Sequence, residues 1–200
     1  MLFLAHCIPL SLTAFIAIPT VYTSALDPRA KTQLCYNDRM SIEYFEDVEL
    51  HKKHKSQEFY LTEKDIIDFA KQWDPQPFHV DPELAKTAKF GGLIASGVHL
   101  INIGQKLINE RRPQAAFIAG LALDDFKWMT PARPGDAVVL EMEAVSKRES
   151  KSINNAGIVR YVYKLLNQRG EELLTYKGTA LTQKRPQSWI QTNSQTDYQK

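Results

Sequence analysis

The sequence predicts an α+β domain in which an antiparallel β-sheet wraps around a central α-helix. Residues 96–111 are apolar almost all the way round the helix that they predict, and such a helix requires burial on several sides. Four segments rich in Val, Ile, Leu, Tyr and Thr follow it, and each is typical of a strand. These segments are 115–128, 137–148, 158–167 and 172–183. A sheet that covers one buried helix accounts for both observations.

Composition predicts one globular domain without a strong electrostatic field. The 200 residues are 44% hydrophobic and 24% charged, and 25 Lys and Arg against 23 Asp and Glu give a net charge of +2. We therefore expect no nucleic-acid partner and no membrane partner. The two cysteines, Cys7 and Cys35, support neither a disulfide framework nor a metal site. We expect a cytoplasmic protein.

The N-terminal segment, residues 1–39, stands apart from the predicted domain. Its apolar run resembles a signal peptide, but no Lys or Arg precedes the run, and Pro9 and Pro19 interrupt it. The favoured interpretation is an upstream extension, with the working domain spanning residues 40–184. Export or organelle targeting stays open as the alternative. Residues 185–200 are polar and are predicted to form a flexible tail.

The first part of the domain predicts an extended lead-in followed by two helices. Residues 41–55 are polar and charged, and His51 and His54 among them lack the acidic or Cys neighbours of a metal site, so we expect a solvated loop there. Thr62 begins a helix that Pro75 ends after Asp74.

The second and third helices have equally clear start signals. Asp81 followed by Pro82 begins a short helix that reaches about Lys89. Ser96 caps the central helix, and Pro113 ends it. His99 lies on this helix and is interpreted as a packing residue.

Turn residues separate the predicted strands. Residues 131–136, which include Pro134 and Gly135, turn the chain between the first two strands. Residues 168–170, Gln-Arg-Gly, predict a hairpin turn between the last two. Consecutive strands joined in this way favour an antiparallel sheet.

Residues 73–81, Trp-Asp-Pro-Gln-Pro-Phe-His-Val-Asp, carry the residues best suited to chemistry. Two prolines favour extended conformations at Asp74 and Gln76, so we expect a stiff, non-helical segment that presents Asp74 and His79. A carboxylate and an imidazole held rigidly together are the groups that general acid/base catalysis requires.

Residues 90–97, Phe-Gly-Gly-Leu-Ile-Ala-Ser-Gly, form a second element. Glycines such as Gly92 allow a ligand to approach the main chain closely. Backbone N–H groups at the start of the following helix point toward an anion or a carbonyl oxygen. A thioester carbonyl fits such a position, because polarising its oxygen acidifies the α-carbon.

Together these residues resemble the MaoC-like dehydratase and (R)-specific enoyl-CoA hydratase family, over about residues 40–184. The family motif is an Asp, a spacer, an Asn, a Pro, an aliphatic residue and a His, followed by a Gly-rich turn into the central helix. Asp74 and His79 match its catalytic pair, and Gly97 matches the glycine whose N–H holds the thioester oxygen. Ser96 stands where many members carry His.

The resemblance implies a hot-dog fold and a hydro-lyase that acts on a coenzyme A or carrier-protein thioester, without a metal or another cofactor. In the implied mechanism, the water molecule that is added to the substrate lies between Asp74 and His79, and Gln76 helps to hold it in place. The substrate-binding residues implied are Gln76, Phe78, Gly92, Leu93, Ile94 and Ser96. A homodimer or a dimer of dimers is expected.

Two other functions remain open from the sequence. A hot-dog acyl-CoA thioesterase would direct water at the carbonyl carbon, and the spacing of Asp74 and His79 favours the lyase over it. A non-catalytic acyl-thioester-binding subunit would keep the same pocket. Gln76, one methylene longer than the Asn of the motif, is the residue that keeps this second alternative open.

Overall fold

The computed structural model describes residues 42–186, so the segment 1–39 and most of the predicted tail lie outside the described residues. Its elements are β1 (Ile42–Glu43), the 3-10 helix η1 (Phe45–Asp47), β2 (Lys53–Leu61), α1 (Glu63–Trp73), α2 (Pro77–Val80), α3 (Pro82–Thr87), α4 (Gly97–Glu110), β3 (Gln114–Ala115), β4 (Phe117–Trp128), β5 (Asp136–Glu149), β6 (Ala156–Leu166) and β7 (Glu172–Gln183). At its end the described chain is held by Arg185, which donates to both carboxylate oxygens of Asp47 at 2.6 Å.

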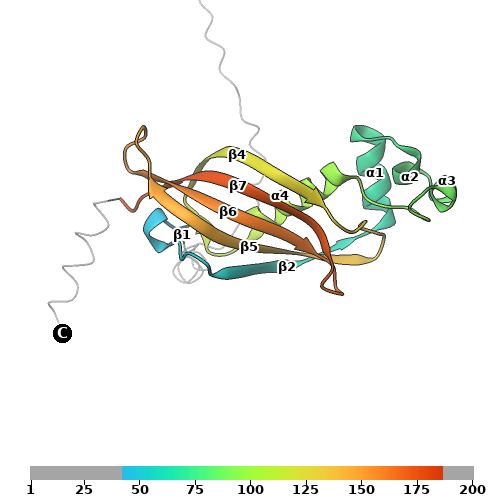
Figure 1. Ribbon diagram of the computed structural model, residues 1–200, viewed down its shortest axis with the longest axis horizontal. Coiled ribbons are helices and arrows are strands. Elements are labelled where there is room, and N and C mark those ends of the chain that lie inside the picture. The colour runs from blue at the N-terminus through green and yellow to red at the C-terminus, as the bar shows by residue number, and fades with distance from the viewer. Residues whose placement is uncertain (1–41, 187–200) are drawn as a thin grey trace, which may run out of the picture. The chain divides into compact units, whose positions relative to one another are not determined.

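Five strands form one antiparallel sheet in the order β2-β5-β6-β7-β4 (Figure 1). The strands β4 to β7 follow the four predicted segments closely, which confirms the antiparallel sheet. Gly135 and Gly170, with φ of 88° and 77°, lie in the two predicted turns. Both turns need the left-handed conformation that glycine adopts without strain.

The helix α4 packs against one face of this sheet, as the hot-dog fold requires (Figure 1). The buried residues of α4 are His99, Leu100, Ile103, Gly104 and Leu107. They join one hydrophobic core with strand residues such as Val138, Leu140 and Leu165. The expectation that this helix is buried on several sides was wrong for a single copy of the chain. Val98 is 50% exposed, and Asn102, Gln105 and Lys106 are also exposed.

The strand β2 was not predicted, since residues 41–55 were expected to form an extended lead-in at the edge of the domain and no strand was expected before Thr62. Its side chains are mostly polar, because it lies at the edge of the sheet and pairs only with β5. The register shifts between Lys55 and Glu58, and at this bulge the Ser56 hydroxyl accepts a hydrogen bond from Leu140 N–H at 2.9 Å. Pairing of the backbone therefore defines this strand where hydrophobic periodicity does not.

The helices α1, α2 and α3 gather at one end of the sheet (Figure 1). Thr62 caps α1 in a reciprocal capping box with Asp65, and the Asp81 carboxylate caps α3 by accepting from Glu83 N–H and Leu84 N–H. Both helix starts agree with the sequence prediction. This helical cluster carries the residues of the candidate site.

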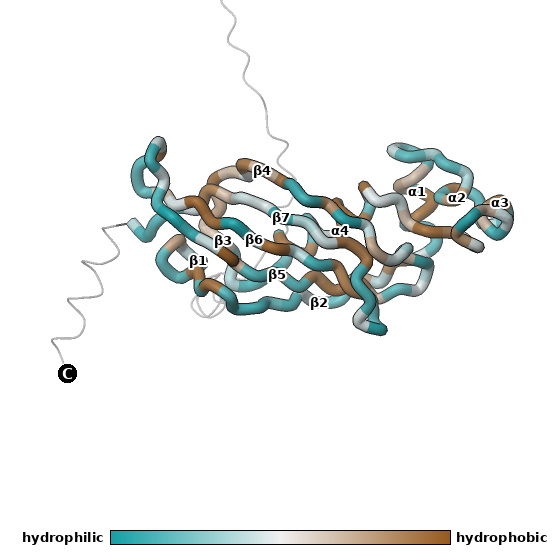
Figure 2. Tube along the Cα trace, viewed as in Figure 1, coloured by the Kyte–Doolittle hydropathy of each residue, from teal (hydrophilic) through white to brown (hydrophobic). Residues whose placement is uncertain are grey.

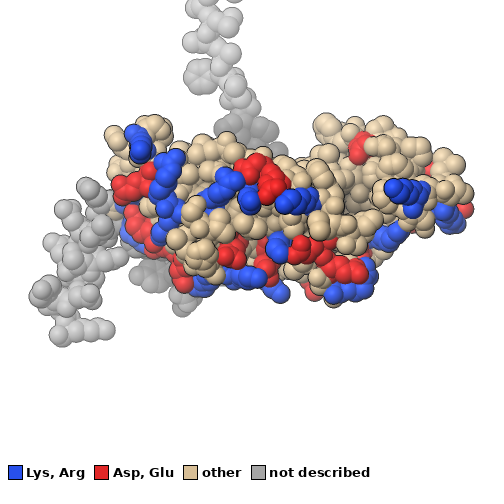
Figure 3. All heavy atoms as spheres, in the orientation of Figure 1, with Lys and Arg blue, Asp and Glu red and all other residues tan. Residues whose placement is uncertain are grey.

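Charges of both signs intermingle on the molecular face that Figure 3 displays. Many of them are paired across strands, as in the ion pairs of Arg160 with Asp124 and of Lys177 with Asp125. Such exposed pairs contribute little stability each. They leave no large area of a single sign on this face, in keeping with the near-balanced composition.

Candidate active site

The segment between α1 and α3 presents Asp74 and His79 on the same side of the chain. Asp74 caps the C-terminus of α1, and Pro75 prevents a further turn. Gln76 is extended and serves as the N-cap of α2. The expectation of a non-helical segment was wrong for residues 77–80, which form one helical turn with Pro77 at its first position. The turn brings the His79 ring back toward Asp74.

His79 is buried, with 5% of its surface exposed, and its orientation is fixed by one backbone carbonyl. Its Nδ1 lies 2.7 Å from the oxygen of Ile94. A carbonyl oxygen only accepts, so Nδ1 must donate, and the neutral ring then carries its lone pair on Nε2. That nitrogen lies 3.6 Å from Oδ2 of Asp74.

Asp74 is held in its ionised form by two side-chain donors. The Ser96 hydroxyl donates to Oδ2 at 2.6 Å, and the Gln76 amide donates to Oδ1 at 3.3 Å. The hydrogen bond from Ser96 is the main reason why the pKa of Asp74 lies below its usual value, with smaller contributions from Gln76 and His79. Partial burial opposes this shift without reversing it.

The 3.6 Å separation is longer than a direct hydrogen bond, so Oδ2 of Asp74 and Nε2 of His79 both keep acceptor capacity toward the cleft. When the carboxylate of Asp74 is ionised and the ring of His79 is neutral, both atoms can accept a proton. Such a pair is suited to withdraw a proton from one small donor and to return it elsewhere.

A cleft of about 450 Å³ opens beside the pair and is mostly apolar. It is lined by Asp74, Gln76, Phe78, His79, Phe90, Ile94, Ala95, Gly97, Leu100, Trp128, Met129, Thr130, Pro131 and Ala132. Apolar walls with a few convergent polar groups are typical of a small-molecule site. The cleft therefore joins the acid/base pair to the start of α4.

Gly97 is the first residue of α4, so its N–H has no acceptor within the helix. A methyl group at this position would lie 2.4 Å from Nε1 of Trp128. Only glycine therefore lets the indole of Trp128 pack directly onto the start of the helix. Gly97 and Trp128 both line the cleft.

The structure brings six of the nine predicted site residues to the cleft: Asp74, Gln76, Phe78, His79, Ile94 and Gly97. The other three lie elsewhere. Ser96 is fully buried behind Asp74, and Leu93 belongs to the hydrophobic core. Gly92, with φ of 150°, lies beside the guanidinium of Arg133. None of these three residues lines the cleft, and their contact with substrate stays a prediction.

Sequence reasoning missed the wall formed by Trp128 and Met129, at and just after the end of β4. These residues are 54% and 58% exposed. The sequence feature that could have indicated this wall is a pair of large apolar side chains directly before Thr130 and Pro131, where the strand ends. Their relation to Asp74 depends on the sheet, which sequence spacing does not reveal.

His99 packs, as predicted, instead of joining the site. Its ring stacks on Phe69 with centroids 4.3 Å apart, and burial lowers its pKa. A neutral imidazole suits this position. Within residues 42–186, no three His, Cys, Asp or Glu side chains gather as a metal ion would require.

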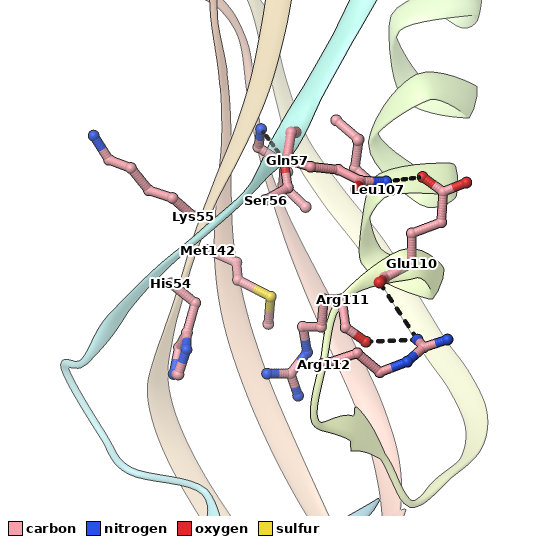
Figure 4. A pocket seen from close by; sticks show the side chains of 10 residues that line it. His54, Lys55, Ser56, Gln57, Leu107, Glu110, Arg111, Arg112 and Met142 are labelled. Atoms are coloured by element: carbon pink, nitrogen blue, oxygen red, sulfur yellow. Dashed lines mark hydrogen bonds between the residues drawn. The ribbon is translucent and has the colours of Figure 1, made fainter. Parts of the chain in front are cut away.

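A separate, smaller hollow, of about 250 Å³, lies between the bulge of β2 and the C-terminal end of α4 (Figure 4). Its polar groups largely satisfy one another. The Gln57 amide donates to Glu110 at 3.0 Å, and the Arg112 guanidinium donates to the last carbonyls of the helix, including that of Arg111 at 2.9 Å. Figure 4 shows Lys55 pointing away from these groups, and Arg111, which also lines the hollow, forms an ion pair with Glu43.

Comparison with known proteins assigns the family. The model of the MaoC like domain matches residues 47–163. The uncharacterized protein YdeM of Bacillus subtilis is 31% identical over 125 residues, which are 62% of this chain and 86% of YdeM. The crystal structure of the MaoC-like dehydratase from Rhodospirillum rubrum superimposes with a TM-score of 0.67 at 33% identity, covering 72% of this chain and 98% of that one. This chain therefore belongs to the MaoC-like dehydratase family, which includes dehydratases and hydratases.

A further relative has a named reaction. The 3-hydroxyacyl-[acyl-carrier-protein] dehydratase FERN of tomato, a mitochondrial protein, is 25% identical over 122 residues, which are 60% of this chain and 70% of FERN. In the described part of this chain, no helix is both long enough and apolar enough to span a bilayer.

Proposed function

We propose that this protein is a hydro-lyase that adds water to the double bond of a trans-2-enoyl thioester, giving an (R)-3-hydroxyacyl thioester, or removes it. The observation that carries the proposal is the pairing of Asp74 and His79 at one side of an apolar cleft whose end is the free N–H of Gly97. The name of the tomato relative supports the same class of reaction on an acyl thioester.

The thioester oxygen accepts a hydrogen bond from Gly97 N–H at the positive end of the α4 dipole. Withdrawal of charge toward this oxygen makes the β-carbon electrophilic and stabilises the enolate that forms after attack. The apolar walls, among them Phe78 and Ile94, hold the acyl chain and exclude bulk water.

One water donates its two hydrogen bonds to Oδ2 of Asp74 and Nε2 of His79. Its oxygen bonds to the β-carbon as one of the pair takes a proton, and a proton passes from the pair to the α-carbon. Atoms balance, since OH and H are added and the pair returns to its starting protonation state. The two groups titrate as a coupled pair, and the proton belongs to the pair as a unit. Addition of water needs no redox cofactor.

The substrate carrier in this proposal is coenzyme A or an acyl carrier protein, and the working unit is a homodimer or a dimer of dimers. The strand β4 supports the proposed oligomer, because it lies at an edge of the sheet and its first half is strongly hydrophobic (Figure 2). Phe117, Ile118, Leu121 and Leu123 are each between 46% and 60% exposed. A long apolar edge strand needs a partner strand, and a second copy of this chain provides one.

Incubation with trans-2-butenoyl-CoA tests the proposal. Loss of the enoyl absorbance with formation of 3-hydroxybutanoyl-CoA is the expected result. Release of free coenzyme A would indicate a thioesterase instead. Binding without turnover would indicate a non-catalytic acyl-thioester-binding subunit, in which Gln76 fails to seat the water.

A further inference from the structure

The helix α4 has a cavity on its sheet-facing side near each end. The candidate active-site cleft lies at its start, beside Gly97 and Leu100. A second cavity, of about 470 Å³, lies at its C-terminal half. The residues lining the second cavity include Ile108 on α4 and Tyr161, Tyr163, Gly178 and Ala180 on the sheet. No residue lines both cavities.

A continuous row of stacked aromatic rings separates the two cavities. Trp128 lies 6.0 Å from Phe126, Phe126 lies 5.3 Å from Tyr176, and Tyr176 lies 4.8 Å from Tyr163, measured between ring centroids. Trp128 lines the cleft and Tyr163 lines the second cavity. Phe126 and Tyr176 line neither, so these two rings form an aromatic partition between the cavities.

Two glycines of α4 lie directly against rings of this row. Gly97 and Gly104 are two helical turns apart and therefore lie on the same face, about 10 Å from each other along the axis. A methyl group at Gly104 would lie 2.8 Å from the hydroxyl oxygen of Tyr176, just as one at Gly97 would meet Trp128. The partition thus fills the space between helix and sheet without a gap at Gly104.

The partition is also rigidly held. Tyr176 is 3% exposed, and its ring stacks on both sides, against Phe126 and Tyr163. Leu100, 2% exposed, fills the helix face between the two glycines. An acyl chain that starts from a thioester at Gly97 and runs along α4 passes Leu100 first and then reaches Tyr176 at Gly104, about 10 Å from Gly97 along the helix axis.

We propose that the aromatic partition of Phe126 and Tyr176 restricts this enzyme to short acyl chains, and that the second cavity would hold the tail of a longer chain if the partition were opened. The inference rests on the proposed function. Gly120, Ala122, Gly178 and Ala180 give the second cavity small residues along its walls, which leaves room for a methylene chain.

Hydration rates of butenoyl-, hexenoyl- and decenoyl-CoA by the full chain test the inference. For the wild-type protein we expect kcat/KM to fall at least tenfold from hexenoyl- to decenoyl-CoA. Equal rates for all three substrates would overturn the inference and leave the proposed function intact. Absence of hydration for all three would instead overturn the proposed function.

Tyr176→Ala tests the partition itself. We expect it to raise the ratio of decenoyl- to butenoyl-CoA turnover at least tenfold, whereas the matched control Tyr176→Phe, which keeps the ring, leaves the ratio unchanged. Adding Ala180→Phe to Tyr176→Ala fills the second cavity and should return the ratio of decenoyl- to butenoyl-CoA turnover to the wild-type value.

Retained butenoyl-CoA turnover shows that each variant is folded, and Phe126→Leu replaces Tyr176→Ala if the latter does not fold. An unchanged ratio in a folded variant of the partition would overturn the inference.

Discussion

The Ser96 hydroxyl has the most specific role of any residue outside the proposed acid/base pair. It is fully buried and donates to the Asp74 oxygen that faces His79. Because the hydroxyl stabilises the carboxylate form, it is the main cause of the lowered pKa of Asp74. Ser96 is therefore a positioning residue, which keeps the carboxylate ionised and aimed at the cleft.

Ser96→Ala tests this role, since the small change leaves the core intact. Loss of the donor raises the pKa of Asp74, so the acidic limb of the pH profile of kcat/KM moves to higher pH. A hydrogen bond to a charged group contributes about 1.5–3 kcal/mol, so a shift of about one pH unit or more is expected. Ser96→Thr keeps a hydroxyl and serves as the control. An unshifted acidic limb in Ser96→Ala would show that Ser96 does not act on Asp74.

At the scale of residues, the sequence predicts that Asp74 and His79 lie close together, but it does not predict the hydrogen-bond partner of each side chain. Asp74 and His79 lie five positions apart in a proline-rich segment, so their proximity follows from local conformation. Ser96 was expected to bind substrate, and the sequence did not predict that its hydroxyl binds Asp74, 22 residues away. Orientation of such a side chain depends on the packing of α1 against α4, which no local pattern encodes.

At the scale of elements, the start of α4 depends on a glycine that accommodates an aromatic ring from the sheet. Gly97→Ala places a methyl group 2.4 Å from Nε1 of Trp128, so the indole must move out of the cleft wall. We expect kcat/KM for hydration to fall at least tenfold. Thermal unfolding should change by only a few degrees, because alanine favours the helix and Trp128 is half exposed.

Val98→Ala is the matched control for this prediction. Val98 follows Gly97 on α4 but is 50% exposed and does not line the cleft. Its truncation should leave kcat/KM near the wild-type value. Equal losses in both variants would show that the start of the helix is merely sensitive to substitution.

Elements with strong local signals were predicted well, and those without were not. The caps at Thr62, Asp81 and Ser96 mark three helix starts correctly, because a capping side chain contacts residues two or three positions away. The strand β2 has no such signal, since its partner β5 lies some 80 residues further on. Long-range pairing of the backbone decides its conformation.

At the scale of the whole molecule, the exposed apolar edge of β4 predicts self-association. Leu121→Lys places a charge on that edge, where lysine opposes strand pairing. Sedimentation analysis should show a wild-type dimer and a variant dimer weakened at least tenfold. Leu84→Lys, at a 55% exposed leucine of α3, serves as the control and should remain dimeric. A wild-type protein that sediments as a monomer would contradict the proposed assembly.

In the proposed reaction Asp74 and His79 act together on one water, and the hydration of butenoyl-CoA by Asp74→Asn and His79→Ala tests this role directly. Asp74→Asn should keep the wild-type thermal unfolding temperature to within a few degrees, whereas His79→Ala, which empties a buried position and leaves the Ile94 carbonyl without its donor, should unfold at a lower temperature but remain folded in the assay. Removal of a general acid or base typically costs about 10²–10⁴-fold, and we expect a fall of that size in kcat for each variant. Near-native turnover by either folded variant would contradict the joint action of Asp74 and His79 on the water.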